Sequence, residues 1–333
     1  MSSGDLRIVT TKTPLLITFT GGVTDLQQYY RNYGPGAVVS AAIARYIYIS
    51  VSRNFRKDEI RVIYSKMKNG LNSVNEIQHP TVREAKKLLD ISTGIQVVRI
   101  TEVLSGGNGL GSSSSFLVGL LNTLYTWIEE TVSLRQLADE AVKIKRNILG
   151  EPGGKQDQYI SAFCGVQYIE FERSENVTLK RINIKGEKLS ELNDQLFIFY
   201  TGVKRKSVDL QKDQSNGIDI DRSGYDRMRD IAKETKECLE NYDFNHLGKL
   251  KDGNWEVKKS LSKKISQDLI DNRNSQATNA GSVGGKLIRA GGGGFLLFLT
   301  PMERQNHFAD ALNVLERHRI NIENLGSRVI YLE

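Results

Sequence analysis

The sequence has few of the residues on which disulfide scaffolds, zinc sites and rigid linkers depend. Its 333 residues include two cysteines, four histidines and five prolines. The cysteines, Cys164 and Cys238, lie far apart without metal-ligand spacing, which argues against a disulfide framework or a zinc site. We expect both thiols to be small core residues in a reducing compartment, and we therefore predict a cytoplasmic location.

Long apolar runs are also missing. The longest, residues 116–128, is shorter than the roughly 20 residues that cross a bilayer, and it contains Asn122. No apolar stretch directly follows the N-terminal residues, as a secretion signal would require. We therefore predict no membrane contact.

Positive charge is in excess but is not gathered into one block. The chain carries 46 lysines and arginines against 39 aspartates and glutamates, a net charge of +7. Small groups such as Lys258-Lys259 are interpreted first as solvated helix faces, and second as a mild positive field that suits anionic small molecules. Aromatic residues do not alternate with these charges, so we predict no nucleic-acid partner.

The remaining composition is typical of a globular protein, with 39% hydrophobic and 26% charged residues. A chain of this length favours two closely packed domains. Strand-like and helix-like patterns follow one another without a regular βαβ order, which predicts the α+β class. Residues 37–53 begin with a helix-like pattern and end in strand-like alternation, and a helix is predicted over 302–317.

The segment SGGNGLGSSSSFLVGLL, residues 105–121, suits phosphate but matches neither common phosphate loop. Ser112 follows Gly111 where a Walker loop needs lysine, and it also stands where a dinucleotide fingerprint needs its last glycine. A strand, a glycine turn and a serine-rich helix start would nevertheless aim free amides and the positive end of a helix dipole at an anion. The alternative is a flexible turn with a serine N-cap.

Four motifs resemble, in order, the signatures of the GHMP kinases, the family of galactokinase, homoserine kinase, mevalonate kinase and phosphomevalonate kinase. They are TPLLITFTGGVTDLQQYY, GGNGLGSSSSFLVGLLNTLY, GEPGGKQDQYISAFCG and GGKLIRAGGGGFLLFL. The resemblance implies a two-domain α+β fold. Residues 1–185 would form a ribosomal-protein-S5-like domain with the phosphate loop and a catalytic aspartate, and residues 186–333 a ferredoxin-like α/β domain with the third motif.

The same resemblance implies an enzyme that uses ATP and Mg²⁺ to phosphorylate a hydroxyl of a small, phosphorylated metabolite. Within the family, GGxTDLxxYY, GKQDQY and NWEVKKSLS look most like the heptose-phosphate kinase branch, so D-glycero-D-manno-heptose 7-phosphate is the first expected substrate. A mevalonate 3-phosphate 5-kinase is the alternative, and a non-catalytic nucleotide-binding sensor is the second alternative. A homodimer is possible.

Site residues are carried over from the resemblance. The phosphate loop would bind the nucleotide through Gly106, Gly107, Gly109, Gly111, Ser112, Ser113 and Ser114. Ser113 would also lie next to Mg²⁺ as its protein ligand. Asp157 would orient the acceptor hydroxyl and take its proton, with a plain helix cap as the alternative. Lys155 would hold phosphate charge or depress the pKa of Asp157.

The substrate side is implied by the first and third motifs. Asp25 would bind substrate hydroxyls, with an N-cap role as its rival. The other expected substrate-binding residues are Thr24, Gly292 and Gly293, and weaker candidates for a substrate-borne phosphate are Lys204, Lys286 and Arg289.

Three positions depart from the family pattern. Leu16 stands where arginine is usual, and Val23 replaces the third glycine of the first motif. Lys145 stands where the family usually offers glutamate to magnesium. Either Lys145 contacts phosphate directly, or metal binding is weakened.

Overall fold

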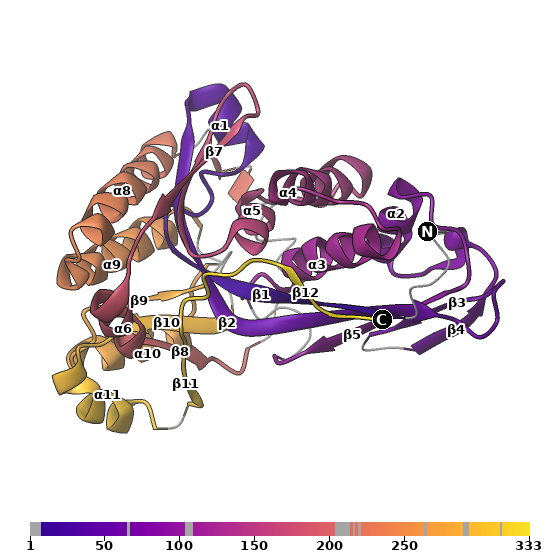
Figure 1. Cartoon of the computed structure of the whole chain (residues 1–333). Helices are drawn as coiled ribbons and strands as arrows, with labels where there is room; N and C mark the ends of the chain where they lie inside the picture. The colour runs from indigo at the N-terminus through magenta and orange to yellow at the C-terminus, as the bar shows by residue number, and fades with distance from the viewer. Residues whose placement is uncertain are drawn as a thin grey trace.

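The computed structural model describes residues 8–64, 67–103, 109–203, 214–215, 217–218, 221–262, 265–288, 293–313 and 315–333. Within these residues the strands form two sheets, with helices packed against both (Figure 1). The predicted α+β class is therefore confirmed.

The large sheet has eight strands in the described part of the chain and is built around one long strand, β2 (Gly36–Arg53). The first half of β2 pairs with β6 (Val166–Phe171) and the second half with β5 (Ile95–Thr101). β1 (Ile8–Thr20) runs antiparallel along its other edge. The remaining strands are β3 (Ile60–Ile63), β4 (Met67–Leu71), β7 (Val177–Ile182) and β12 (Arg328–Leu332).

The course of β2 corrects our expectation that residues 37–53 begin as a helix. Residues 36–43 are all buried, and strands lie on both edges of this stretch. A strand that is buried on both faces has a continuous apolar run, which a helix pattern fits equally well when alanines are frequent. Pairing with the neighbouring strands β1 and β6 makes this stretch a strand and not a helix.

The small sheet is antiparallel, in the order β11 (Arg317–Arg319), β8 (Leu196–Tyr200), β10 (Phe295–Leu299) and β9 (Gly284–Leu287). The helix predicted over 302–317 is too long. A 3-10 turn (Met302–Arg304) leads into α11 (Gln305–Ala311), and the next strand forms because residues 317–319 pair with β8.

One helix connects the two sheets. α9 (Phe244–Ser260) packs against β1 and also against β9. α3 (Ser112–Trp127) and α5 (Gln156–Phe163) pack on β1 and β2, and in Figure 1 they lie over the large sheet together with α4. The other helices are α1 (Gln27–Tyr33), α2 (Pro80–Leu88), α4 (Leu134–Val142), α6 (Gly186–Gln195), α8 (Arg222–Glu240) and α10 (Asp268–Asn279), with a 3-10 turn (Val74–Glu76) and a π-helix (Lys143–Ile148).

The large sheet takes a strand from far along the chain. β12 pairs with β1, and Thr13 Oγ1 lies 2.8 Å from Ser327 Oγ. The boundary between residues 1–185 and 186–333 stays a prediction, and β12 belongs to the first sheet although it follows that boundary. Among the described residues, none of the helices has the length and apolar character needed to cross a membrane.

Candidate active site

The predicted phosphate loop meets the start of α3, which is anchored in the core. Gly109 and Gly111 have φ angles of 83° and 76°, a conformation that glycine adopts at little cost. The amides of Ser114 and Ser115 both donate to the carbonyl of Gly111, at 2.9 Å. Ser114 is buried and Ser113 is exposed. Gly106 and Gly107 lie outside the described residues.

Leu16 explains one departure from the family pattern. Its side chain is fully buried directly beneath the loop, where a Cβ on Gly111 would come within 2.5 Å of it. The amide of Leu16 donates to the carbonyl of Leu110 at 3.0 Å. Leucine at this position therefore supports the loop from below, and Gly111 is required by space as well as by φ.

Val23 explains a second departure. This residue replaces a family glycine but keeps a glycine-like φ of 80°, which is strained for a β-branched side chain. Its side chain is buried against Tyr225 and Met228 of α8. Apolar packing therefore holds the turn between β1 and α1 in its conformation.

Lys145 occupies the space in front of α3. Its ammonium donates to Ser113 Oγ at 3.0 Å and pairs with Glu151 Oε2 at 2.8 Å. The lysine sits on the π-helix (Lys143–Ile148), a form that is often found at functional sites. The predicted magnesium-proximal hydroxyl is thus bound by a lysine, and a carboxylate lies beside that lysine.

Asp157 and Asp25 come together at the N-terminus of α5. Asp157 is half-buried in the first turn of this helix. Asp25 is 2% exposed, and its Oδ2 accepts a hydrogen bond from the amide of Gln156 at 3.1 Å. A Cβ on Gly154 would lie 1.6 Å from the same oxygen, so Gly154 makes room for Asp25.

This geometry revises the rival role that we gave to Asp25. The carboxylate caps α5 and not its own helix, because α1 has Leu26 at its N-cap and no side-chain cap. A cap role and a substrate role remain compatible, since the carboxylate has a second oxygen. The positive end of the α5 dipole also favours negative charge at this point.

Lys155 has a partner other than Asp157. Its buried ammonium lies 2.8 Å from Glu175 Oε2 and 4.6 Å from the centre of the Tyr30 ring. It thereby ties the start of α5 to the turn between β6 and β7. The catalytic role of Lys155 stays a prediction from the resemblance, without support from this contact.

Two other predicted substrate residues, Thr24 and Gly293, make contacts that stabilise the fold. The Thr24 hydroxyl donates to the carbonyls of Gly21 and Ala37 and accepts from the amide of Ala37. A Cβ on Gly293 would lie 2.5 Å from the carbonyl of Val203, so this glycine allows the end of β8 to approach closely. Gly292, Lys204 and Arg289 lie outside the described residues.

Sequence reasoning missed a buried polar face on α9. Lys258, which we interpreted as part of a solvated helix face, is 3% exposed, whereas Lys259 is ion-paired near the surface. Lys251 and Asn254 are fully buried on the same face. The helical spacing of these polar residues beside Leu247 and Trp255 is the only signal that the sequence offered.

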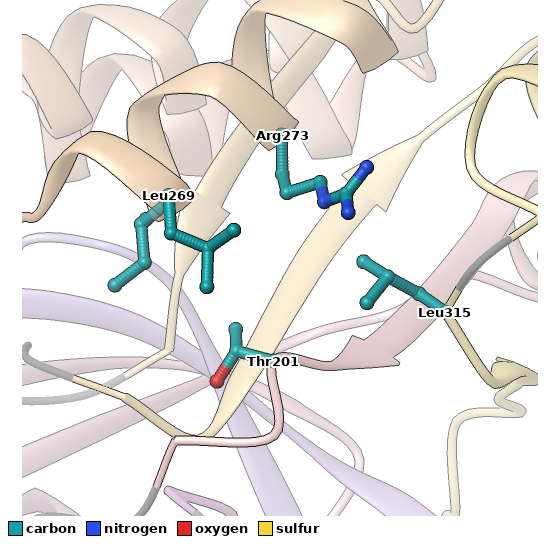
Figure 2. A pocket seen from close by; sticks show the side chains of 5 residues that line it. Thr201, Leu269, Arg273 and Leu315 are labelled. Carbon is teal, nitrogen blue, oxygen red and sulfur yellow. The ribbon is translucent and has the colours of Figure 1, made fainter.

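A separate hollow lies on the small sheet (Figure 2). It is lined by Thr201, Leu269, Ile270, Arg273 and Leu315. Leu269 and Arg273 come from α10, and Thr201 follows the end of β8 (Figure 2). None of the predicted site residues that the structure describes lines this hollow, so the candidate active site is placed elsewhere.

Comparison with known proteins shows which family the chain resembles. Residues 75–165 match the family model described as the GHMP kinases N terminal domain. Over 324 aligned residues the chain is 27% identical to the D-glycero-alpha-D-manno-heptose 7-phosphate kinase of Campylobacter jejuni, covering 92% of this chain and 94% of that protein. The chain is thus similar to GHMP kinases along most of its length, and its residues 75–165 match the N-terminal domain of that family.

Two further proteins are similar to this chain. A mevalonate kinase of Thermococcus sibiricus is 26% identical over 78% of this chain and 75% of that protein. A solved D-glycero-D-manno-heptose 1-phosphate kinase from Bacteroides thetaiotaomicron has the same fold, with a TM-score of 0.81 and 23% identity over 97% of this chain and 99% of that one. The protein is therefore an ATP-dependent phosphotransferase with an alcohol group as acceptor, and its fold is the two-domain GHMP kinase fold.

Proposed function

We propose that this GHMP kinase transfers the terminal phosphoryl group of ATP to a hydroxyl of a small phosphorylated sugar, with D-glycero-D-manno-heptose 7-phosphate as the first substrate to test. The relative that carries this name for its substrate aligns with almost the whole chain. The sequence motifs of the first and third signatures support the same branch.

One contact supports the proposal most directly. Ser115 Oγ on α3 lies 3.0 Å from Ser161 Oγ on α5, and both side chains are buried. This bond fixes the helix that follows the phosphate loop against the helix that carries Asp157. Phosphoryl transfer depends chiefly on positioning and charge neutralisation, and a rigid pair of helices provides the positioning.

In the proposed reaction, the acceptor oxygen attacks the terminal phosphorus and ADP leaves. Asp157 orients the attacking hydroxyl and accepts its proton. Lys145 and the first amides of α3 bind negative phosphate charge on the nucleotide side. Asp25 is the further candidate for binding an acceptor hydroxyl, through the oxygen that does not cap α5.

Magnesium fits this site only as an ion held mainly by the nucleotide. In the described part of the chain, no group of three or more His, Cys, Asp or Glu residues could hold a metal ion. The side chains of Ser113 and Glu151, which both contact Lys145, have oxygen atoms of the kind that coordinate Mg²⁺. Mg²⁺ usually keeps several waters and substrate phosphates as ligands. When bound, Mg²⁺ supplies charge neutralisation on the phosphates.

Two alternatives are kept because a specific observation favours each. Mevalonate kinase relatives favour a mevalonate 3-phosphate 5-kinase. Lys145 in place of a glutamate favours a nucleotide-binding sensor without turnover. A homodimer, a cytoplasmic location and the domain boundary after residue 185 stay predictions from the sequence.

The test is release of ADP with a panel of acceptors: heptose 7-phosphate, other sugar phosphates, mevalonate and mevalonate 3-phosphate. Turnover on a sugar phosphate supports the proposal, turnover on mevalonate 3-phosphate alone supports the alternative, and nucleotide binding without turnover supports the sensor. Asp157→Asn should lower turnover at least about a hundredfold with little change in ATP affinity. Unchanged turnover would remove Asp157 from its role.

A further inference from the structure

β12 is an exposed apolar strand at one edge of the large sheet. It pairs with β1 on one side, and no other strand in the described part of the chain pairs with it. Its residues 329–332 are valine, isoleucine, tyrosine and leucine, and each is between 38% and 55% exposed. The backbone groups along such an edge pair readily with a strand of another chain.

Two other edge strands carry the charges that usually prevent such pairing. β7, at another edge of the large sheet, has Lys180 and Arg181, and both side chains are exposed. β11, at an edge of the small sheet, begins and ends with an exposed arginine. Charged side chains on an edge strand oppose its pairing with a further strand. β12 has no charged residue between Arg328 and Glu333, so its edge lacks this protection.

The backbone of β12 presents polar groups at this edge. Glu333 bonds to Ile8 through both its amide, at 3.0 Å, and its carbonyl, at 2.9 Å. Successive residues of a strand turn their amide and carbonyl groups to opposite edges, so those of Leu332 point away from β1. The exposed edge therefore presents a donor and an acceptor at Leu332.

An irregularity in the pairing gives Val329 the same outward orientation. Val329 and Tyr331 lie opposite two adjacent residues of β1, so one residue of β12 is extra, as in a β-bulge. Adjacent residues turn to opposite edges, so Val329 turns away from β1 whereas Tyr331 turns towards it. Outward amide and carbonyl groups therefore lie at both ends of the apolar stretch.

We propose that two copies of this chain bind each other through β12, with the two strands antiparallel across a two-fold axis. An axis between Ile330 and Tyr331 places Val329 of each copy opposite Leu332 of the other. The outward backbone groups of the two copies then meet, and the apolar side chains of residues 329–332 cover one another. The inference does not depend on the proposed function.

Charge favours the same register. It places Arg328 of each copy opposite Glu333 of the other, and opposite charges directly across two strands attract. Arg328 also pairs with Glu323 at 3.3 Å, so the contact between the copies contributes to the choice of register more than to affinity. A second copy is favoured over a different protein because the strand is complementary to itself in this arrangement.

The oligomeric state of the full chain tests the proposal. Pairing of two five-residue strands is small for a permanent interface, so we expect monomer and dimer to exchange. Sedimentation velocity over a dilution series that reaches about 100 µM measures the dissociation constant of the dimer. The wild type should sediment as a dimer at the highest concentration and dissociate on dilution.

Ile330→Lys gives β12 a charge of the kind that β7 carries. Ile330 is 48% exposed, so the fold should tolerate the change, and the melting temperature should stay that of the wild type. The dissociation constant of the dimer should rise about 30-fold or more, because each substitution enters the interface twice. Ile100→Lys is the matched control, since Ile100 is 61% exposed on β5, inside the sheet and away from its edge. It should leave the dissociation constant within about twofold.

A second variant tests the backbone contact alone. Leu332→Pro removes an outward amide donor and takes no hydrogen bond from β1, so it should also dissociate the dimer. It keeps the proposal testable if Ile330→Lys folds poorly.

Four results would overturn the proposal. They are a wild-type monomer at about 100 µM, a dimer that resists both β12 variants, equal weakening by Ile100→Lys, and assemblies larger than a dimer, because a two-fold contact closes after two copies. Since none of these measurements uses ATP or an acceptor, each result leaves the proposed kinase activity untouched.

Discussion

At the residue scale, one lysine sets the charge where we propose that the nucleotide binds. Lys145 stands where the family resemblance implies a magnesium-binding glutamate, and its ammonium lies 3.0 Å from Ser113 Oγ. A fixed positive charge there would neutralise phosphate oxygens of a bound nucleotide directly. Glu151, on the following turn, keeps a carboxylate 2.8 Å from the lysine. The site therefore has one lysine and one carboxylate. The lysine stands at the position where the resemblance implies the carboxylate, and the carboxylate comes from Glu151.

Lys145→Met tests this assignment. Loss of a charged donor should weaken AMPPNP binding about tenfold and make turnover more dependent on Mg²⁺, since the metal then neutralises more phosphate charge. Calorimetry and a magnesium titration of the rate give the two values. Lys143→Met, an exposed lysine on the same π-helix, should leave both unchanged. If the Lys145→Met protein binds AMPPNP and responds to Mg²⁺ like the wild type, Lys145 has no role in binding the nucleotide.

Single site residues could be proposed from the sequence where a motif surrounds them. Asp157 and the loop serines could be proposed because four motifs occur in one order. The burial of Lys258 could not be predicted, because this residue is one charge among 46 lysines and arginines. Its burial arises only when α9 packs between β1 and β9, segments that lie far from it in the chain.

At the scale of elements, turns and helix starts are completed by distant parts of the chain. α5 has no side-chain cap from its own N-cap residue, and Asp25 from the turn after β1 supplies the missing acceptor. Most helices and strands could be predicted from periodicity, whereas this cap could not. Leu16 beneath Gly111 is a second example, because only the folded chain brings β1 under the loop.

Gly111→Ala tests how strictly the loop is shaped. The alanine would carry an unfavourable φ of 76° and would also overlap Leu16, which lies 2.5 Å from the new Cβ. Gly150→Ala is the matched control, because Gly150 has a φ of 62° with nothing within 4 Å of the new Cβ. We expect urea unfolding to show a loss of about 1–2 kcal/mol for the control and about 1–3 kcal/mol more for Gly111→Ala. Equal losses would contradict the tight fit between loop and strand.

At the scale of the whole molecule, the acid limit of stability should depend on the contact that holds α5 to the β6–β7 turn. Burial raises the pKa of Glu175, but hydrogen bonds from Lys155, Tyr30 and Arg31 outweigh it and lower that pKa from 4.5 to about 2. A lowered carboxyl pKa stabilises the folded state above the unfolded value and ceases to do so as the pH falls through the folded one.

Glu175→Gln should therefore lower the melting temperature near neutral pH. The difference from the wild type should shrink as the pH falls from 4.5 towards 2, where the wild-type carboxyl becomes protonated. Thermal melting over this range measures it. Glu187→Gln, at an exposed carboxylate on α6, is the control and should follow the wild type at every pH. A constant difference across the range would mean that charge at Glu175 is not the cause.

The return of β12 to the edge of β1 has a consequence for biosynthesis. β1 leaves the ribosome about 300 residues before residues 328–332, which complete its hydrogen bonding. Until then the nascent chain carries an unpaired strand edge of the kind that invites association with other chains. A translation product that stops before residue 328 would keep that edge open, so protection by a chaperone should matter more for it than for the longer chain.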